Sequence, residues 1–271
     1  MSDEERRENG QEEFSLVFGD VFHDVPDLRL PALTSSEVQL VYDHTKRIIG
    51  SMVEYRELMM MYTCAIKEVK TKFDVLNTEF NVRYRRNPIE FISTRLKRTS
   101  SIAEKLAKKG LALSAENIEN NISDVAGVRV ICAYIDDIYS IADALIKQDD
   151  ITLIKRKDYI AEPKPNGYRS LHLIVSVPVF FAEERRDMRV EVQIRTIAMD
   201  FWASLEHQLK YKQVIGNQDE IVKRLKNCAD VISDTDKEML SIRSEIELAE
   251  DIPSEDDILF EKIKDFDVPI Y

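Results

Sequence analysis

The stretch Arg189–Thr196 reads R-V-E-V-Q-I-R-T, an unbroken alternation of polar and apolar residues. Because successive side chains of a β-strand point to opposite faces, the pattern predicts a strand with Arg189, Glu191, Gln193 and Arg195 on one face. The aliphatic residues between them would face a core. An alternation of this length is also typical of an ordinary solvent-facing strand, so its meaning depends on the rest of the chain.

The remaining patterns predict a mixed α/β fold of the α+β kind, with a mixed sheet of about five strands flanked by helices. Further strands are expected at 125–134, 151–154 and 171–177, and the apolar first of these should be covered on both faces. Long helical segments are expected at each end, over 34–80 (as one helix or two joined helices) and 219–249. Shorter helices are expected from Pro88 through R-L-K-R at 95–98, from a cap at Ser100 or Ser101 to Gly110, and at 136–147 and 198–211.

Composition and charge limit the classes of protein. The chain has 271 residues, 44% of them hydrophobic, and neither a secretory signal nor an apolar run long enough to span a bilayer, so a cytoplasmic protein without a membrane partner is expected. Of the net charge of −12, residues 1–13 carry −4 and residues 247–271 carry −7. The nearly neutral centre disfavours double-stranded nucleic acid as the ligand. We expect a flexible acidic arm at 1–33, one domain at 34–250 and an acidic tail at 251–271.

A second cluster of polar residues follows a turn signal. Residues 159–172 read Y-I-A-E-P-K-P-N-G-Y-R-S-L-H, in which the prolines and Gly167 predict a turn. Lys164 offers a charge to phosphate, and Tyr168 offers a ring on which a base can stack. An ordinary hairpin is an equally good interpretation of this segment alone.

Two more groups complete the candidate site. Cations surround a helix start in R-L-K-R-T-S-S-I-A-E-K, an arrangement that suits a polyphosphate but is also typical of a solvated basic face. Asp124 precedes an apolar strand that also carries Arg129. Asp124 would either cap a turn or, together with Glu191, form a two-carboxylate site for Mg²⁺.

Together these segments resemble the small alarmone synthetases, the single-domain relatives of RelA/SpoT-type enzymes that make (p)ppGpp. The resemblance is carried, in the expected order, by R-L-K at 95–97, D-V-A-G-V-R at 124–129, P-K-P-N-G-Y-R-S-L-H at 163–172, E-V-Q-I-R-T at 191–196 and F-W-A-S-L-E-H at 201–207. It implies a nucleotidyltransferase-like fold that transfers the β,γ-pyrophosphate of ATP to the 3′-hydroxyl of GDP or GTP with Mg²⁺.

The resemblance also implies roles for individual residues. Glu191 would be the catalytic base and, with Asp124, a metal ligand. The expected ATP-binding residues are Arg95 and Arg129 around adenine, with Lys97, Ser101 and Lys105 on the phosphates. The expected GDP- or GTP-binding residues are Tyr168 on guanine, with Lys164, His172, Gln193, Arg195 and Asp200.

Some points stay open at the level of sequence. The family often has Asn where this chain has Asp200, which puts the guanine-edge contact in doubt. With only four histidines, a separate hydrolase site is not expected. The GDP or GTP preference and regulation by RNA are undecided, and a homo-oligomer, such as a tetramer, is expected from the terminal helices. The rival hypothesis is a catalytically silent regulator that binds nucleotides or single-stranded RNA.

Overall fold

A computed structural model describes residues 35–84, 87–211 and 218–250. The expected arm at 1–33 and tail at 251–271 lie outside these residues, as does Thr34, the expected cap of the first helix. The chain divides into two compact units, residues 1–50 and 51–271. In the first, the described residues 35–50 are helical; the second unit carries the sheet.

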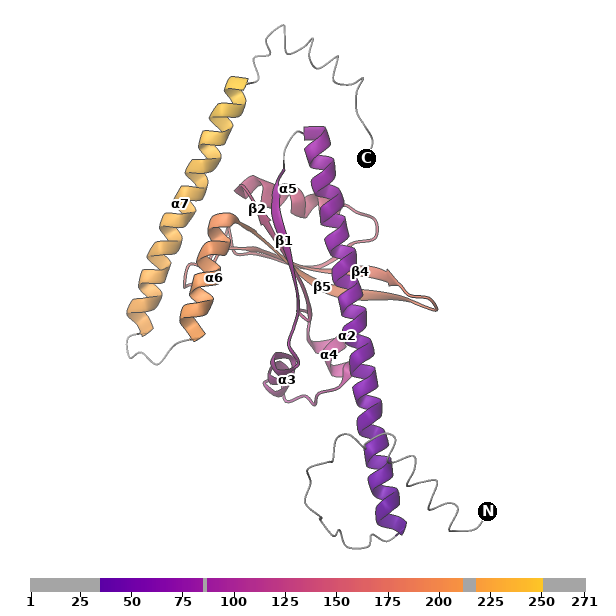
Figure 1. Cartoon of the computed structure of the whole chain (residues 1–271). Helices are drawn as coiled ribbons and strands as arrows, with labels where there is room; N and C mark the ends of the chain where they lie inside the picture. Colours follow the sequence, from indigo (N-terminus) through magenta and orange to yellow (C-terminus); the bar gives the residue numbers. More distant parts are fainter. Residues whose placement is uncertain (1–34, 85–86, 212–217, 251–271) are drawn as a thin grey trace, which may run out of the picture. The chain divides into compact units, whose positions relative to one another are not determined.

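The second unit contains a mixed five-stranded sheet, as predicted (Figure 1). The strands are β1 Ile89–Leu96, β2 Ala126–Cys132, β3 Thr152–Asp158, β4 Leu171–Phe180 and β5 Arg185–Thr196, in the order β1-β2-β5-β4-β3. Only β2 and β5 pair in parallel, with Gly127 opposite Glu191 and Arg129 opposite Gln193; the other pairs are antiparallel. This register aligns the polar row of β5 with the polar positions of β2.

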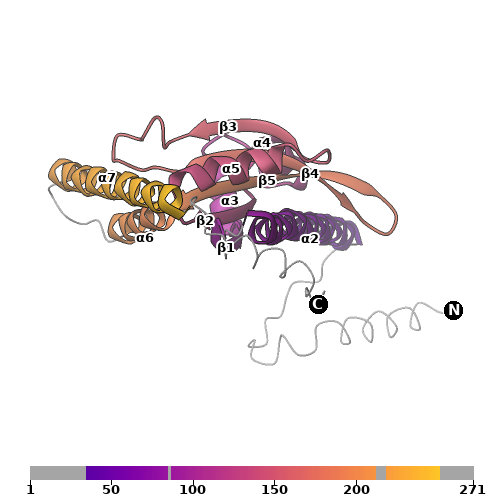
Figure 2. The same ribbon diagram turned by 90° about the horizontal axis from the view of Figure 1, so that it is seen from above.

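The helices are α2 Ser35–Tyr84, α3 Thr99–Ala107, α4 Ala115–Asn121, α5 Ile135–Ile146, α6 Ile197–Tyr211 and α7 Gln218–Glu250. The first is one continuous helix, which settles the choice between one helix and two. Figures 1 and 2 both show α6 and α7 side by side, next to one end of the sheet. Among the described helices, none is both long and apolar enough to cross a membrane.

One core lies against the apolar face of the sheet. The strand side chains that alternate inward, such as Val128, Val192 and Leu173, are buried in a single cluster with apolar residues of α2, α3, α4 and α5. Burying these side chains is the main stabilising contribution, at about 25 cal/mol for each Å² of apolar surface removed from water. The opposite face of β2, β4 and β5 is left for polar side chains.

Three expectations about local structure were wrong. Residues 89–96, expected to be helical after Pro88, form strand β1, because their β-branched and aromatic residues pair with β2 along the sheet edge. Helix α3 is not capped by Ser100 or Ser101: it begins after Arg98 without a side-chain cap. Strand β2 is not covered on both faces, since Gly127 and Arg129 line a cavity.

Candidate active site

The alternating stretch of β5 has the two faces that the sequence predicts. Val190, Val192 and Ile194 are fully buried in the core, whereas Glu191 and Gln193 point to the other face. There they line a cavity of about 260 Å³. Its other lining residues come from β1 and β2: Ser93, Thr94, Arg95, Gly127, Val128 and Arg129.

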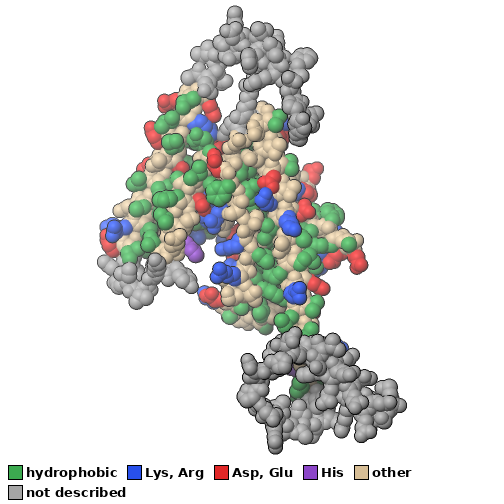
Figure 3. Space-filling model, viewed as in Figure 1, with side chains coloured by type: hydrophobic (Ala, Val, Ile, Leu, Met, Phe, Trp, Pro, Cys, Tyr) green, Lys and Arg blue, Asp and Glu red, His purple; other side chains and the backbone are tan. Residues whose placement is uncertain are grey.

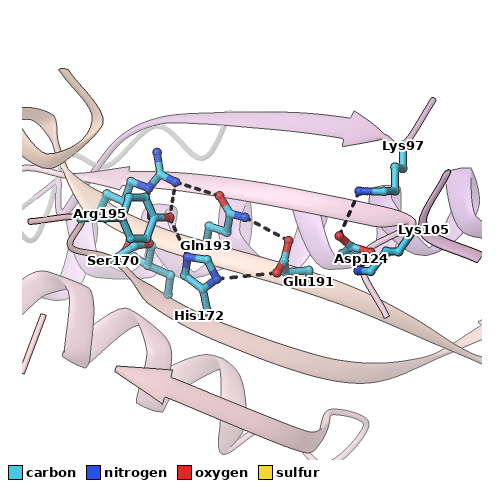
Figure 4. A network of polar contacts seen from close by, with 10 residues as sticks. Lys97, Lys105, Asp124, Ser170, His172, Glu191, Gln193 and Arg195 are labelled. Atoms are coloured by element: carbon cyan, nitrogen blue, oxygen red, sulfur yellow. Dashed lines mark hydrogen bonds and ion pairs between the residues drawn. The ribbon is translucent and has the colours of Figure 1, made fainter. Parts of the chain in front are cut away.

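Glu191 is a restrained, ionised carboxylate at this cavity. Gln193 Nε2 donates a hydrogen bond to Oε2 at 3.0 Å, and His172 Nδ1 lies 3.6 Å from Oε1 (Figure 4). Burial raises the pKa of Glu191, but the contacts with His172 and Gln193 outweigh burial and hold the pKa below its usual 4.5. A carboxylate in this state is ionised at neutral pH, so its oxygens are free to take a proton from a reacting hydroxyl.

Hydrogen bonds connect Glu191 to the turn segment. Tyr168 Oη lies 2.8 Å from His172 Nε2 and accepts a bond of 2.6 Å from Arg195 Nη2, which also donates to Gln193 Oε1 at 3.0 Å. Arg195 is almost completely buried, and its Nε donates to Ser170 Oγ at 3.3 Å. The structure thus brings the predicted acceptor residues together in one network (Figure 4).

The Tyr168 ring is surrounded by cations. Lys164 Nζ lies 4.8 Å from the ring centroid and the Arg195 guanidinium lies 5.1 Å from it. Lys164 also lies 4.7 Å from the centre of the Tyr159 ring, which makes an edge contact with His172. Sequence reasoning gave Tyr159 no role; its position at the start of the proline-rich segment was the available signal. Ser170 was not assigned a role from the sequence either.

Asp124 belongs to a separate group beside the same row (Figure 4). Its Oδ1 accepts a hydrogen bond from Lys105 Nζ at 2.8 Å and its Oδ2 accepts one from Lys97 Nζ at 3.1 Å. Burial raises the pKa of Asp124, and the two ammonium groups outweigh it, so the pKa lies below its usual 3.8. Ser101 lies one helical turn before Lys105 in α3, half-buried. Two of the three residues expected on the ATP phosphates, Lys97 and Lys105, therefore contact one carboxylate.

Arg95 and Arg129, expected around adenine, both line the cavity. Arg129 Nε is buried and makes no hydrogen bond within the described part of the chain, so it has a donor to spare. Arg129 Nη1 donates to Asp200 Oδ1 at 3.3 Å, and the same oxygen accepts from Arg195 Nη1 at 3.0 Å. Asp200 thus joins Arg129, expected to bind ATP, to Arg195, expected to bind GDP or GTP, and the sequence did not reveal this contact.

Asp124 and Glu191 lie along the same row (Figure 4), and repulsion from Asp124 raises the pKa of Glu191, though less than the opposing contacts lower it. Within the described ranges, no group of three or more His, Cys, Asp or Glu side chains could hold a metal ion. Mg²⁺ is commonly held by one or two carboxylates, with substrate phosphates supplying other oxygens. Two ionised carboxylates, one of them paired with the ammonium groups of Lys97 and Lys105, fit that donor set.

On the face shown in Figure 3, Lys and Arg side chains gather near the centre, over the sheet and beside α6. Although the net charge of the chain is −12, this surface is locally cationic. A cationic surface next to a cavity attracts anionic ligands such as nucleotides.

Comparison with known proteins agrees with this geometry. Residues 94–215 match the family described as the region found in RelA / SpoT proteins. GTP pyrophosphokinase YwaC of Bacillus subtilis is 40% identical over 78% of this chain and its own full length, and GTP pyrophosphokinase YjbM of the same organism is 38% identical over 73% of this chain and 92% of its own. The crystal structure of small alarmone synthetase 1 from B. subtilis bound to its product pppGpp aligns with a TM-score of 0.65 at 36% identity, over 71% of this chain and 97% of that one.

Proposed function

The chain belongs to the RelA/SpoT family, and from its small alarmone synthetase relatives we propose that it transfers the β,γ-pyrophosphate of ATP to the 3′-hydroxyl of GDP or GTP. In this reaction the acceptor's 3′-oxygen forms a bond to the β-phosphorus of ATP. The bond between that phosphorus and the oxygen bridging to the α-phosphate breaks, and AMP leaves. The proton of the 3′-hydroxyl must go to a base.

One observation carries the assignment of that base. Glu191 is an ionised carboxylate that lines the cavity and lies between the Lys97–Lys105–Asp124 group and the aromatic acceptor segment. We assign it the proton from the 3′-hydroxyl, with Gln193 and His172 holding its orientation. General-base catalysis of this kind typically contributes 10² to 10⁴ in rate.

The donor nucleotide is assigned to the β1–β2 side of the cavity. Arg95 and Arg129 would stack on adenine, while Lys97, Ser101 and Lys105 would bind the phosphates. Arrival of ATP would draw the two ammonium groups from Asp124 toward the phosphates. Asp124 and Glu191 would then hold Mg²⁺, which neutralises charge on the phosphates when bound.

The acceptor nucleotide is assigned to the turn segment. Tyr168 would stack on guanine, and Lys164 and His172 would contact phosphate. Gln193 and Arg195 would position the ribose and Glu191. Asp200 Oδ1 accepts hydrogen bonds from both Arg129 and Arg195, so we assign Asp200 to orienting those arginines.

Self-association is a secondary proposal. We propose a homo-oligomer because α7 leaves apolar side chains such as Met239, Ile242 and Ile246 exposed. Light scattering coupled to size-exclusion chromatography measures its mass.

The catalytic test uses purified protein, Mg²⁺, labelled ATP and GDP or GTP. We expect a guanosine tetra- or pentaphosphate and AMP in equal amounts. Glu191→Gln should lower turnover about 10²- to 10⁴-fold while ATP still binds. Glu183→Gln, the same change at an exposed position before β5, should have no effect.

Two outcomes would contradict the proposal. Persistent turnover in Glu191→Gln would remove Glu191 from its role. Nucleotide binding without any product in the wild type would favour the silent regulator. That alternative is not favoured, because a pure binding protein gains nothing from two carboxylates that repel phosphates.

A further inference from the structure

The turn segment at 159–172, to which the acceptor nucleotide is assigned, contacts helix α7. This helix lies beyond residues 94–215, which match the family. Gly167, just before Tyr168, has a φ of +89° and approaches α7 closely. A Cβ at Gly167 would come within 2.5 Å of Ala229 Cβ and 3.2 Å of Lys226 Cα. Only glycine allows this backbone conformation and this approach without strain.

Arg169, on the other side of Tyr168, makes the polar connection. Its Nη1 donates to Gly167 O at 3.2 Å and to Ala229 O at 3.1 Å. Its Nη2 donates to Asp230 Oδ1 at 3.1 Å. One largely buried guanidinium therefore binds the loop backbone and α7 together.

Neighbouring contacts extend the same connection. Trp202 Nε1 of α6 donates to Leu225 O at 2.9 Å, and Thr196 Oγ1, at the end of β5, donates to Asp236 Oδ2 at 2.7 Å. By contrast, the ion pairs of Lys97 and Lys105 with Asp124 involve no residue of α7. The helix thus contacts the acceptor side of the site.

We infer that Arg169 is a positioning residue that fixes Tyr168 by tying its loop to α7, so that α7 forms part of the guanosine nucleotide site. The inference rests on the proposed function for the identity of the ligand. It follows from the geometry: Tyr168 is flanked by the two residues that touch α7, and its backbone cannot shift without straining those contacts. Loosening the tie should therefore weaken acceptor binding and spare ATP.

The test measures the two nucleotides separately. Dissociation constants for a fluorescent GDP analogue and a non-hydrolysable ATP analogue are compared, together with KM and kcat, in Arg169→Met and in the milder Asp230→Asn. We expect GDP affinity to fall about tenfold in Arg169→Met, because this variant loses every hydrogen bond of the guanidinium. The fall should be smaller in Asp230→Asn, because only the bond to Asp230 loses its charged acceptor. ATP affinity should change less than twofold. Arg224→Met, on the exposed side of α7, is the matched control.

Failure of this inference and failure of the proposed function give different results. Unchanged GDP affinity in both variants, or equal losses for ATP and GDP, would overturn the inference. Thermal unfolding shows whether Arg169→Met is folded; if it is not, Asp230→Asn decides. Absence of product in a wild type that binds both nucleotides would instead overturn the proposed function and leave the binding comparison valid.

Discussion

Replacing Asp200 with Asn should lower the free energy of unfolding by about 1 to 2 kcal/mol. Asp200 Oδ1 accepts hydrogen bonds from Arg195 and Arg129. A hydrogen bond to a charged partner contributes about 1 kcal/mol more than a neutral one, and Asn keeps an acceptor while losing the charge. The Arg195 side chain is 5% exposed, so its bond to Asp200 is given its full energetic contribution. The Arg129 side chain is 37% exposed, so the contribution of its bond is reduced because water screens the charges.

The assay is thermal and urea unfolding of the variant beside the wild type. A loss of this size corresponds to a melting temperature roughly 3 to 6 °C lower for a domain of this length. Asp187→Asn is the matched control. The side chain of Asp187 is 60% exposed and that of its ion-pair partner Arg185 is 58% exposed, so this pair should contribute little to stability. In a double-mutant cycle with Arg195→Met, the losses should not add. An Asp200→Asn protein as stable as the wild type, or strictly additive losses, would refute the reasoning.

Three more predictions address the two halves of the site. Tyr168→Ala should weaken GDP binding by about 1 to 3 kcal/mol, roughly five- to 150-fold, because stacking is lost; a titration with ATP serves as its control. Lys105→Met should raise the KM for ATP more than the KM for GDP in steady-state assays, and equal effects would contradict its assignment to phosphate. The pKa of Asp124 is lower in the folded protein than in the unfolded chain. Its ion pairs therefore stabilise the folded protein fully at a pH above the unfolded pKa, and this stabilisation is lost as the pH falls through the folded pKa. Urea titrations should therefore show wild type and Asp124→Asn converging in acid; a constant difference down to pH 2 would count against the pairing.

The sequence predicted the polar face of β5 because strand alternation is a local property that needs no partner. The helical prediction for residues 89–96 failed because Pro88 and the R-L-K-R segment are good helix signals, while the strand depends on pairing with β2, a nonlocal contact. Of the cavity residues, Arg95, Arg129, Glu191 and Gln193 were predicted with the help of the resemblance, and the structure places them around one cavity. Ser93, Thr94, Gly127 and Val128 were not predicted. The Arg129–Asp200 bond and the Arg169–Asp230 bond join residues 71 and 61 positions apart in sequence, and no local pattern encodes such contacts.

Strand β3 forms an edge of the sheet, and its residues are almost all exposed. An uncovered edge offers unpaired backbone groups to any other extended chain, which is a route to aggregation. Here Lys155, Arg156 and Lys157 occupy the middle of that edge. Their positive charges repel the same charges on the β3 edge of a second molecule. This repulsion disfavours pairing between the sheets of two molecules, even at high concentration.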